Sequence, residues 1–326
     1  METLSFDITA PGECMGGCNI CVVGTLAKSE KTEYNIPIKV WNSIQAILNL
    51  PEYSDYAYTL SLSRISTMNW SSLLPLARLS PKGINIAIGV WEKFAYDSMA
   101  IFLASFFPKI SNVSLVVAQW SANIQEQIQE LAPLTELAMQ LLKTWRYKRI
   151  GIGTWVNDVA TDTAIRDAQK RYAKLHLECH QARGKKANEN TTWAKVSNTL
   201  RKNKFNFIGG EEKADGKQLH QYYKDDRDRL FSITTSVRTV AEEHEGTKKD
   251  TIMEDLEKEK KYGPPRRQFM FVGRNVNFHH SQHTNFSEKE ENNASWTTID
   301  NFHDRILPEA QKIGYLKARI NYLEEN

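Results

Sequence analysis

Short apolar runs alternate with helix-like segments along this chain, and that alternation limits the possible folds more than any other feature. Six runs have strand character: residues 4–9, 57–63, 84–90, 113–119, 149–156 and 269–278. Helical periodicity follows Pro37, a residue favoured in the first turn of a helix, and places on one face Val40, Trp41, Ile44, Ile47 and Leu48. Strands joined by helical crossovers pair in parallel. The sequence therefore predicts an α/β fold with functional groups at the carboxyl ends of its strands.

Charge density divides the chain into three predicted parts. Residues 1–156 contain 12 Lys/Arg and 12 Asp/Glu, residues 157–268 contain 24 and 19, and residues 269–326 contain 6 and 8. The middle part is predicted to be a charged, mostly helical insertion that selects a substrate or acts as a lid. The last part is predicted to hold the final strand and one or two terminal helices, with an apolar stripe formed by Ile313, Leu316, Ile320 and Leu323.

Composition excludes several classes of protein. The 326 residues are 41% hydrophobic and 25% charged, which is typical of a globular chain. No apolar run reaches the roughly 20 residues of a membrane helix, and the first residues lack the basic region of a signal peptide. Four cysteines spaced as three plus one do not form a secreted disulfide framework. We therefore expect a cytoplasmic protein.

Three of the four cysteines lie in the segment "GECMGGCNIC", where Cys14, Cys18 and Cys21 have the spacing C-x3-C-x2-C. Gly16 and Gly17 permit the tight turn that wrapping around a metal requires. A four-iron cluster usually takes four cysteines, so three thiolates leave one iron open for chemistry. A structural zinc site completed by a histidine is one alternative, and the absence of any metal is another.

A strand followed by this motif and then by alternating helices and strands resembles the radical S-adenosylmethionine superfamily, over residues 3–156 and 269–280. The resemblance implies a partial (βα)6 TIM-like barrel and a 4Fe-4S cluster on the three cysteines. It also implies S-adenosylmethionine chelated by the open iron and cleaved by one electron from an external donor. The resulting 5′-deoxyadenosyl radical would abstract hydrogen from a substrate.

The resemblance also suggests which residues hold the cofactor. The family often has Gly-Gly-Glu after its second strand, but here the segment reads "SLSRIST", which offers Ser61, Ser63 and Arg64 instead. Polar residues after the fourth strand, Ser121 and Asn123, correspond to the family's ribose or carboxylate contacts. Asn157, after the fifth strand, is a further candidate of the same kind. Ile20 replaces the aromatic residue that often precedes the third cysteine.

Histidines follow the last predicted strand in "NFHHSQH", as His279, His280 and His283. Their position predicts a loop near the active-site rim, where they act as ligands or proton donors, or else as solvated loop residues. The insertion interleaves Lys/Arg with Trp193, Phe205 and Phe207, a pattern that suits nucleic acid. A mixed-charge helical surface is the alternative.

The leading hypothesis is a radical S-adenosylmethionine enzyme with one cluster. The insertion's surplus of five positive charges favours an anionic substrate, such as RNA, a nucleotide or an acidic peptide. A second hypothesis is a non-enzymatic zinc- or cluster-stabilised module for nucleic acid or a protein partner, which would recruit a fourth ligand such as His176, His180 or a histidine of the 279–283 group. A third is a former enzyme that remains as a scaffold. Cys179 is interpreted as a plain helix cysteine.

Overall fold

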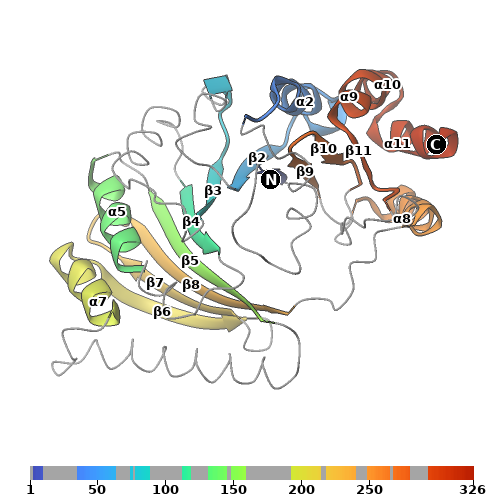
Figure 1. Cartoon of the computed structure of the whole chain (residues 1–326). Coiled ribbons are helices and arrows are strands. Elements are labelled where there is room, and N and C mark those ends of the chain that lie inside the picture. Colours follow the sequence, from blue (N-terminus) through green and yellow to red (C-terminus); the bar gives the residue numbers. More distant parts are fainter. Residues whose placement is uncertain are drawn as a thin grey trace. The chain divides into compact units, whose positions relative to one another are not determined.

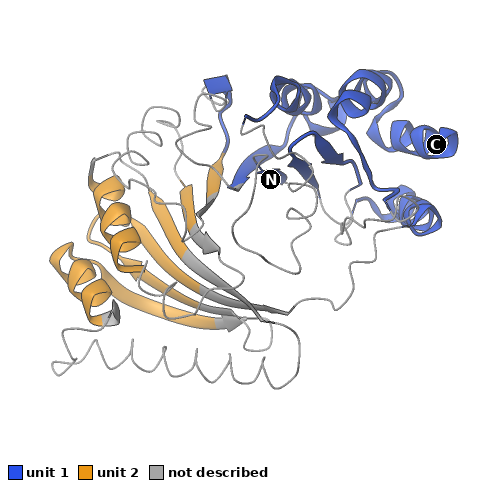
Figure 2. Ribbon diagram, viewed as in Figure 1, with its two compact units in different colours: residues 1–14, 19–81, 243–326 blue, residues 15–18, 82–242 orange. Residues whose placement is uncertain are grey.

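The computed structural model describes residues 3–9, 35–63, 74–75, 78–88, 112–118, 131–144, 148–158, 192–213, 218–239, 248–264, 267–279 and 293–326. The chain forms two compact units (Figure 2). Unit 1 comprises Met1–Cys14, Asn19–Pro81 and Glu243–Asn326, and unit 2 comprises Met15–Cys18 and Lys82–Glu242. Among the helices that the structure describes, none combines the length and apolar character needed to cross a membrane.

Unit 1 contains a five-stranded run built around β1 (Thr3–Thr9) (Figure 1). β1 pairs in parallel with β2 (Ala57–Ser63) on one side and with β9 (Gln268–Val272) on the other. β10 (Asn275–Asn277) then pairs antiparallel with β9 and with β11 (Trp296–Thr298). The order is β11-β10-β9-β1-β2, so the first strand of the chain is central in this unit.

The helices of unit 1 are α2 (Ile38–Leu48), η1 (Pro51–Tyr53), α8 (Lys249–Tyr262), α9 (Ile299–Asn301), η4 (Phe302–Ile306), α10 (Leu307–Ile313) and α11 (Tyr315–Glu325). Aromatic side chains join them to one face of the sheet. Phe6 stacks on Phe269 with ring centroids 5.5 Å apart, and Phe269 contacts Tyr315 of α11 at 5.4 Å. Such pairs add to the free energy gained from apolar burial, so this face forms the core.

Two helix predictions in unit 1 have different outcomes. α2 begins after Pro37 and buries Val40, Trp41, Ile44 and Ile47 as predicted. The C-terminal stripe is wrong as a single face, because Gly314, with φ of 88°, separates α10 from α11. Ile313 is consequently exposed, and α11 buries Tyr315, Ala318, Arg319 and Leu323.

Unit 2 has a parallel run formed by β3 (Gly83–Ile88), β4 (Asn112–Ala118), β5 (Arg149–Asp158) and β8 (Leu230–Thr239). β7 (Gln218–Lys224) and β6 (Asn206–Lys213) extend it antiparallel. α5 (Leu131–Thr144) packs against β5 and α7 (Thr192–Lys202). Pro133 lies within the described part of α5. The described fold is therefore mixed α/β with parallel strand pairs at its centre, as predicted.

Two predictions need correction, one about the last strand and one about the charged insertion. The run 269–278 is not one strand, because Gly273, with φ of 56°, and Arg274 turn the chain back and produce the β9–β10 hairpin. The insertion 157–268 is not mostly helical in its described part, because it contributes β6, β7 and β8 besides α7 and α8. β8 takes the place beside β5, where a sequential sheet would put its sixth strand, and β9 instead lies beside β1.

Candidate functional site

The carboxyl end of β1 is the point from which the chain continues toward the cysteine motif. β1 ends at Thr9, five residues before Cys14 in the sequence. Thr9 pairs with Ser63 of β2 and Val272 of β9, and its carbonyl oxygen accepts a hydrogen bond of 3.1 Å from the Gly273 amide. β1, which leads to the motif, thus has a hydrogen-bonded parallel strand on each side. The carboxyl ends of β1, β2 and β9 lie at the same level.

β1 has a polar face opposite the aromatic core of unit 1, and beside it β9 places on that face Gln268 but also Met270 and the buried Val272. Along β1, the buried Leu4, Phe6 and Ile8 alternate with Ser5, Asp7 and Thr9, because successive side chains of a strand point to opposite faces. Sheets with parallel strands are usually apolar on both faces. A polar second face departs from that rule and suits a polar ligand.

Asp7 is the central group of this polar face. Its Oδ1 accepts a hydrogen bond of 3.3 Å from Ser5 Oγ, and its Oδ2 accepts one from Gln268 Nε2 of β9. In the sheet register Asp7 lies between Ser61 of β2 and Met270 of β9, and all three side chains are half-buried. A carboxylate oriented by an amide and a hydroxyl can bind a cationic or hydroxylated ligand.

Unit 2 has a comparable face formed by small and polar residues. Ser114, Gly151 and Ser232 form a row across β4, β5 and β8, and a methyl group added at Gly151 would lie 3.0 Å from Ser232 Oγ. On β7, His220 Nδ1 lies 3.1 Å from Thr234 Oγ1 of β8. The opposite face is apolar and contains the buried Ile150, Ile152, Phe231 and Ile233. Both units therefore bury one face of the sheet and line the other with polar groups.

Few of the predicted site residues fall within the described part of the chain. Ser61 does, and it pairs with Asp7. Ser63 is the last residue of β2 and Asn157 the next-to-last of β5, each described by its backbone only. The following lie outside the described residues: Cys14, Cys18, Cys21, Arg64, Ser121, Asn123, His176, Cys179, His180, His280 and His283. Among the residues that are described, no group of three or more His, Cys, Asp or Glu could hold a metal ion.

Sequence reasoning missed Asp7 and Gln268. The signal was present in "LSFDIT", where an acidic residue occupies an alternate position of an otherwise apolar strand. Its partner could not be inferred, because Gln268 is 261 residues away in the sequence and β9 was not expected to pair with β1.

The prediction for His279 is wrong in both of its forms. β10 runs antiparallel to β9 and pairs Asn277 with Met270, so the chain leaves β10 toward the amino end of β9, away from Thr9. His279 therefore does not lie near the expected active-site rim. It is also not a solvated loop residue, because its exposure is 3%.

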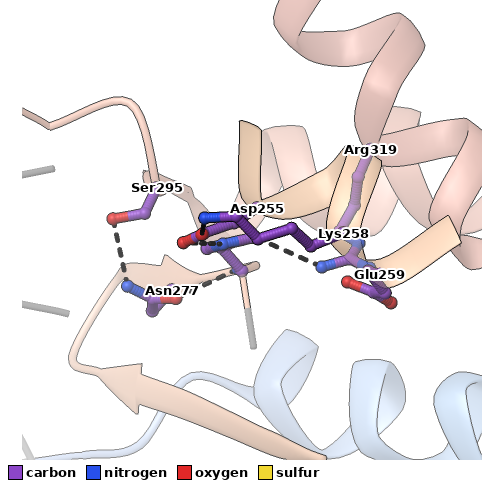
Figure 3. A network of polar contacts seen from close by, with 7 residues as sticks. Asp255, Lys258, Glu259, Asn277, Ser295 and Arg319 are labelled. Carbon is purple, nitrogen blue, oxygen red and sulfur yellow. Dashed lines mark hydrogen bonds and ion pairs between the residues drawn. The ribbon is translucent and has the colours of Figure 1, made fainter. Parts of the chain in front are cut away.

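His279 belongs to a buried ionic cluster with Arg319, Glu259 and Asp255, part of which is labelled in Figure 3. Arg319 Nη2 donates to Glu259 Oε1 at 2.5 Å, and Arg319 Nη1 lies 3.3 Å from His279 Nδ1. Because a guanidinium can only donate, Nδ1 accepts and the neutral ring carries its proton on Nε2, which lies 3.7 Å from Asp255 Oδ2. Burial and the charge of Arg319 lower the pKa of His279 to about 4. The cluster joins α8, the end of β10 and α11.

No protein-family model, curated protein or solved structure matches this chain significantly.

Proposed function

We propose that this protein is a radical S-adenosylmethionine enzyme that works in a reducing cytoplasm. One observation carries the proposal: the C-x3-C-x2-C motif starts five residues after β1, a parallel strand with neighbours on both sides. Loops at the carboxyl ends of parallel strands are where α/β proteins assemble their sites. Cys14, Cys18 and Cys21 would hold a 4Fe-4S cluster there.

The polar sheet face supports the same proposal. S-adenosylmethionine carries an ammonium, a carboxylate and ribose hydroxyls, and when bound to a reduced cluster it supplies a carbon radical that abstracts hydrogen. Asp7 offers a carboxylate to a cationic or hydroxyl group, and Gln268 and Ser5 hold that carboxylate by hydrogen bonds. Ser61 lies beside Asp7 in the register. These side chains would bind and orient the cofactor or the substrate.

The parallel strands support the finer fold proposal, a partial (βα)6 barrel. Counted in chain order, β1, β2, β3, β4, β5 and β8 each form parallel pairs, and so does β9, which lies beside β1. In such a barrel β8, beside β5, would be the sixth strand. The remaining partners are an electron donor and a substrate, for which the insertion's positive charge favours an anion.

The alternative is a zinc- or cluster-stabilised binding module. It needs a fourth protein ligand, and the 279–283 group was one proposed source. His279 is a poor candidate because it is buried and engaged with Arg319 at the amino end of β9. This observation removes His279 from the candidate fourth ligands, whereas His176, His180, His280 and His283 lie outside the described residues.

The metal content of the purified protein distinguishes the radical enzyme from the zinc-stabilised binding module. After purification without oxygen and reconstitution with iron and sulfide, we expect about four irons per chain and charge-transfer absorbance in the visible range. Cys14→Ala, Cys18→Ala and Cys21→Ala should each lose most of both, because each removes a thiolate ligand. Cys179→Ala is the matched control and should retain them. Tightly bound zinc that excludes iron from the wild-type protein would refute the proposal.

A further inference from the structure

Three connections meet at the amino ends of β5 and β8 in unit 2. They are the segment before β5, the turn between α7 and β6, and the turn between β7 and β8. The Leu230 amide donates to the Lys148 carbonyl at 2.9 Å, and Lys224 pairs with both Leu230 and Asn206. Phe205 and Phe231 contact each other beneath these turns, with ring centroids 6.4 Å apart. The three connections therefore form one continuous surface.

This surface is strongly basic, and we call it the basic rim. Its exposed cations are Lys148, Arg149, Arg201, Lys202, Lys204 and Arg227. Two exposed carboxylates accompany them: Asp228, which pairs with Lys224 at 2.7 Å, and Asp226. Within the described part of the chain, none of the six cations forms an ion pair. The whole chain has a formal charge of only +3, so positive charge is concentrated here.

An ion pair between the buried Asp225 and the half-buried Arg229 supports the turn between β7 and β8. Asp225 accepts hydrogen bonds from the backbone amides of Arg227 and Arg229 at 3.0 and 2.9 Å, and from the Arg229 side chain at 2.6 Å. Arg229 also donates to the Leu142 carbonyl near the end of α5, at 2.6 Å. Burial opposes ionisation of Asp225, but the hydrogen bonds from Arg229 outweigh it and lower the pKa of this carboxyl. The pair therefore ties the β7–β8 turn to α5.

Backbone conformation points to the same preorganisation. Lys204 and Asp228 have φ of 60° and 61°, a region that non-glycine residues adopt only where the surroundings hold them. Each lies in one of the two tight turns of the basic rim. Lys204 takes the left-handed position that commonly ends a helix, where the Phe205 amide donates to the Leu200 carbonyl at 3.0 Å. The Asp228 amide donates to the Asp225 carbonyl at 3.1 Å, so both turns are held by backbone hydrogen bonds.

An aromatic side chain borders the basic rim. Phe205 is buried and belongs to the core, but Phe207 is 38% exposed on β6. Of these two phenylalanines, Phe205 therefore has a structural role and Phe207 is accessible at the surface. The Phe207 ring packs edge-on against Tyr223, with ring centroids 5.5 Å apart, and keeps part of its surface exposed. An exposed aromatic ring can stack on a nucleobase while nearby cations bind the backbone phosphates.

We infer that the basic rim binds the phosphodiester backbone of a nucleic acid. From β5 to β6 it crosses three strand spacings, about 14 Å, which at 3.4 Å per phosphate matches about four phosphates of one strand. A row of cations fits a polymer of phosphates better than a single small anion, which needs convergent donors. The exposed Phe207 favours a nucleic acid over an acidic peptide. The inference does not depend on the proposed enzymatic function, because the basic rim lies at the amino ends of β5 and β8.

Fluorescence anisotropy with the full chain tests the inference. The probes are labelled single strands of RNA and of DNA, about 20 nucleotides long, titrated at several KCl concentrations. The variant Lys148→Gln/Lys202→Gln/Arg227→Gln removes one cation from each connection. We expect it to bind about tenfold or more weakly and to reduce the slope of log K against log salt by about 2, since each single-strand phosphate contact contributes about 0.7.

The matched control removes the same charge elsewhere, as Lys249→Gln/Lys312→Gln/Lys317→Gln, from exposed positions in unit 1. It should keep both the affinity and the salt slope of the wild type. Comparison of the RNA and DNA arms identifies which polymer is preferred, and either preference agrees with a phosphodiester site. Equal losses in both triple variants would overturn the inference, as would tighter binding of polyglutamate than of either nucleic acid.

Discussion

Replacing Arg319 with methionine is expected to lower the free energy of unfolding by about 3–5 kcal/mol, because removal of one partner leaves the other charge buried without compensation. Arg319 is fully buried, it pairs with Glu259 at 2.5 Å, and its guanidinium lies 4.8 Å from the centre of the Tyr315 ring. Glu259 is itself only 7% exposed. Urea denaturation followed by tryptophan fluorescence, to which the buried Trp41 and Trp296 contribute, measures the change.

A matched substitution tests whether burial is the cause. Arg305 also forms an ion pair and a cation–π contact, with Glu325 and Tyr322, but its pair is exposed. Arg305→Met should therefore cost less than about 1 kcal/mol. The double variant Arg319→Met/Glu259→Leu should recover much of the loss, since an apolar replacement of a buried pair is often near neutral. Equal costs for Arg319→Met and Arg305→Met would contradict this account.

Acidification is expected to destabilise unit 1 through His279. Burial and Arg319 lower the pKa of His279 from 6.5 to about 4 in the native protein. Between these values the unfolded chain binds a proton that the native protein does not, so stability falls as the pH drops through this window. The full effect is about 3 kcal/mol. Glu259 and Asp255 act in the opposite direction on the same ring, and they do not reverse the shift.

The difference between wild type and His279→Gln isolates this contribution. Glutamine can still accept a hydrogen bond from Arg319 but does not titrate, so its unfolding free energy should fall less between pH 7 and about pH 4. Parallel pH curves for wild type and His279→Gln would show that the ring is not held neutral.

The elements predicted correctly share a strong local pattern. β1 to β5 are apolar runs bounded by polar or helical segments, and α2 has one apolar stripe after a proline. β8 was missed because its sequence, "LFSITTSVRT", lies in a segment whose average composition is dominated by charge. The sequence predicts a single strand over residues 269–278 because nothing local distinguishes Gly273 from a glycine inside a strand. The positive φ of Gly273, which makes the turn, is evident only from the structure.

The site was less predictable than the fold because its contacts are distant in sequence. The spacing of the cysteines indicates a chemistry, but nothing local indicates that Asp7 meets Gln268, or that Arg319 meets His279 and Glu259. Partners across 40 to 261 residues depend on strand order and on the direction of β10. That direction also explains why His279 lies at the opposite end of the strand from the one expected.

The most direct test of the proposed function is reductive cleavage of S-adenosylmethionine. The reconstituted protein is incubated without oxygen with dithionite and S-adenosylmethionine, and 5′-deoxyadenosine is quantified by chromatography beside Cys18→Ala and Cys179→Ala. We expect 5′-deoxyadenosine from the wild type and from Cys179→Ala and none above background from Cys18→Ala. A wild-type protein that carries a full, reducible cluster and binds S-adenosylmethionine, yet forms no more product than Cys18→Ala with dithionite or a biological reductant, would contradict the proposal.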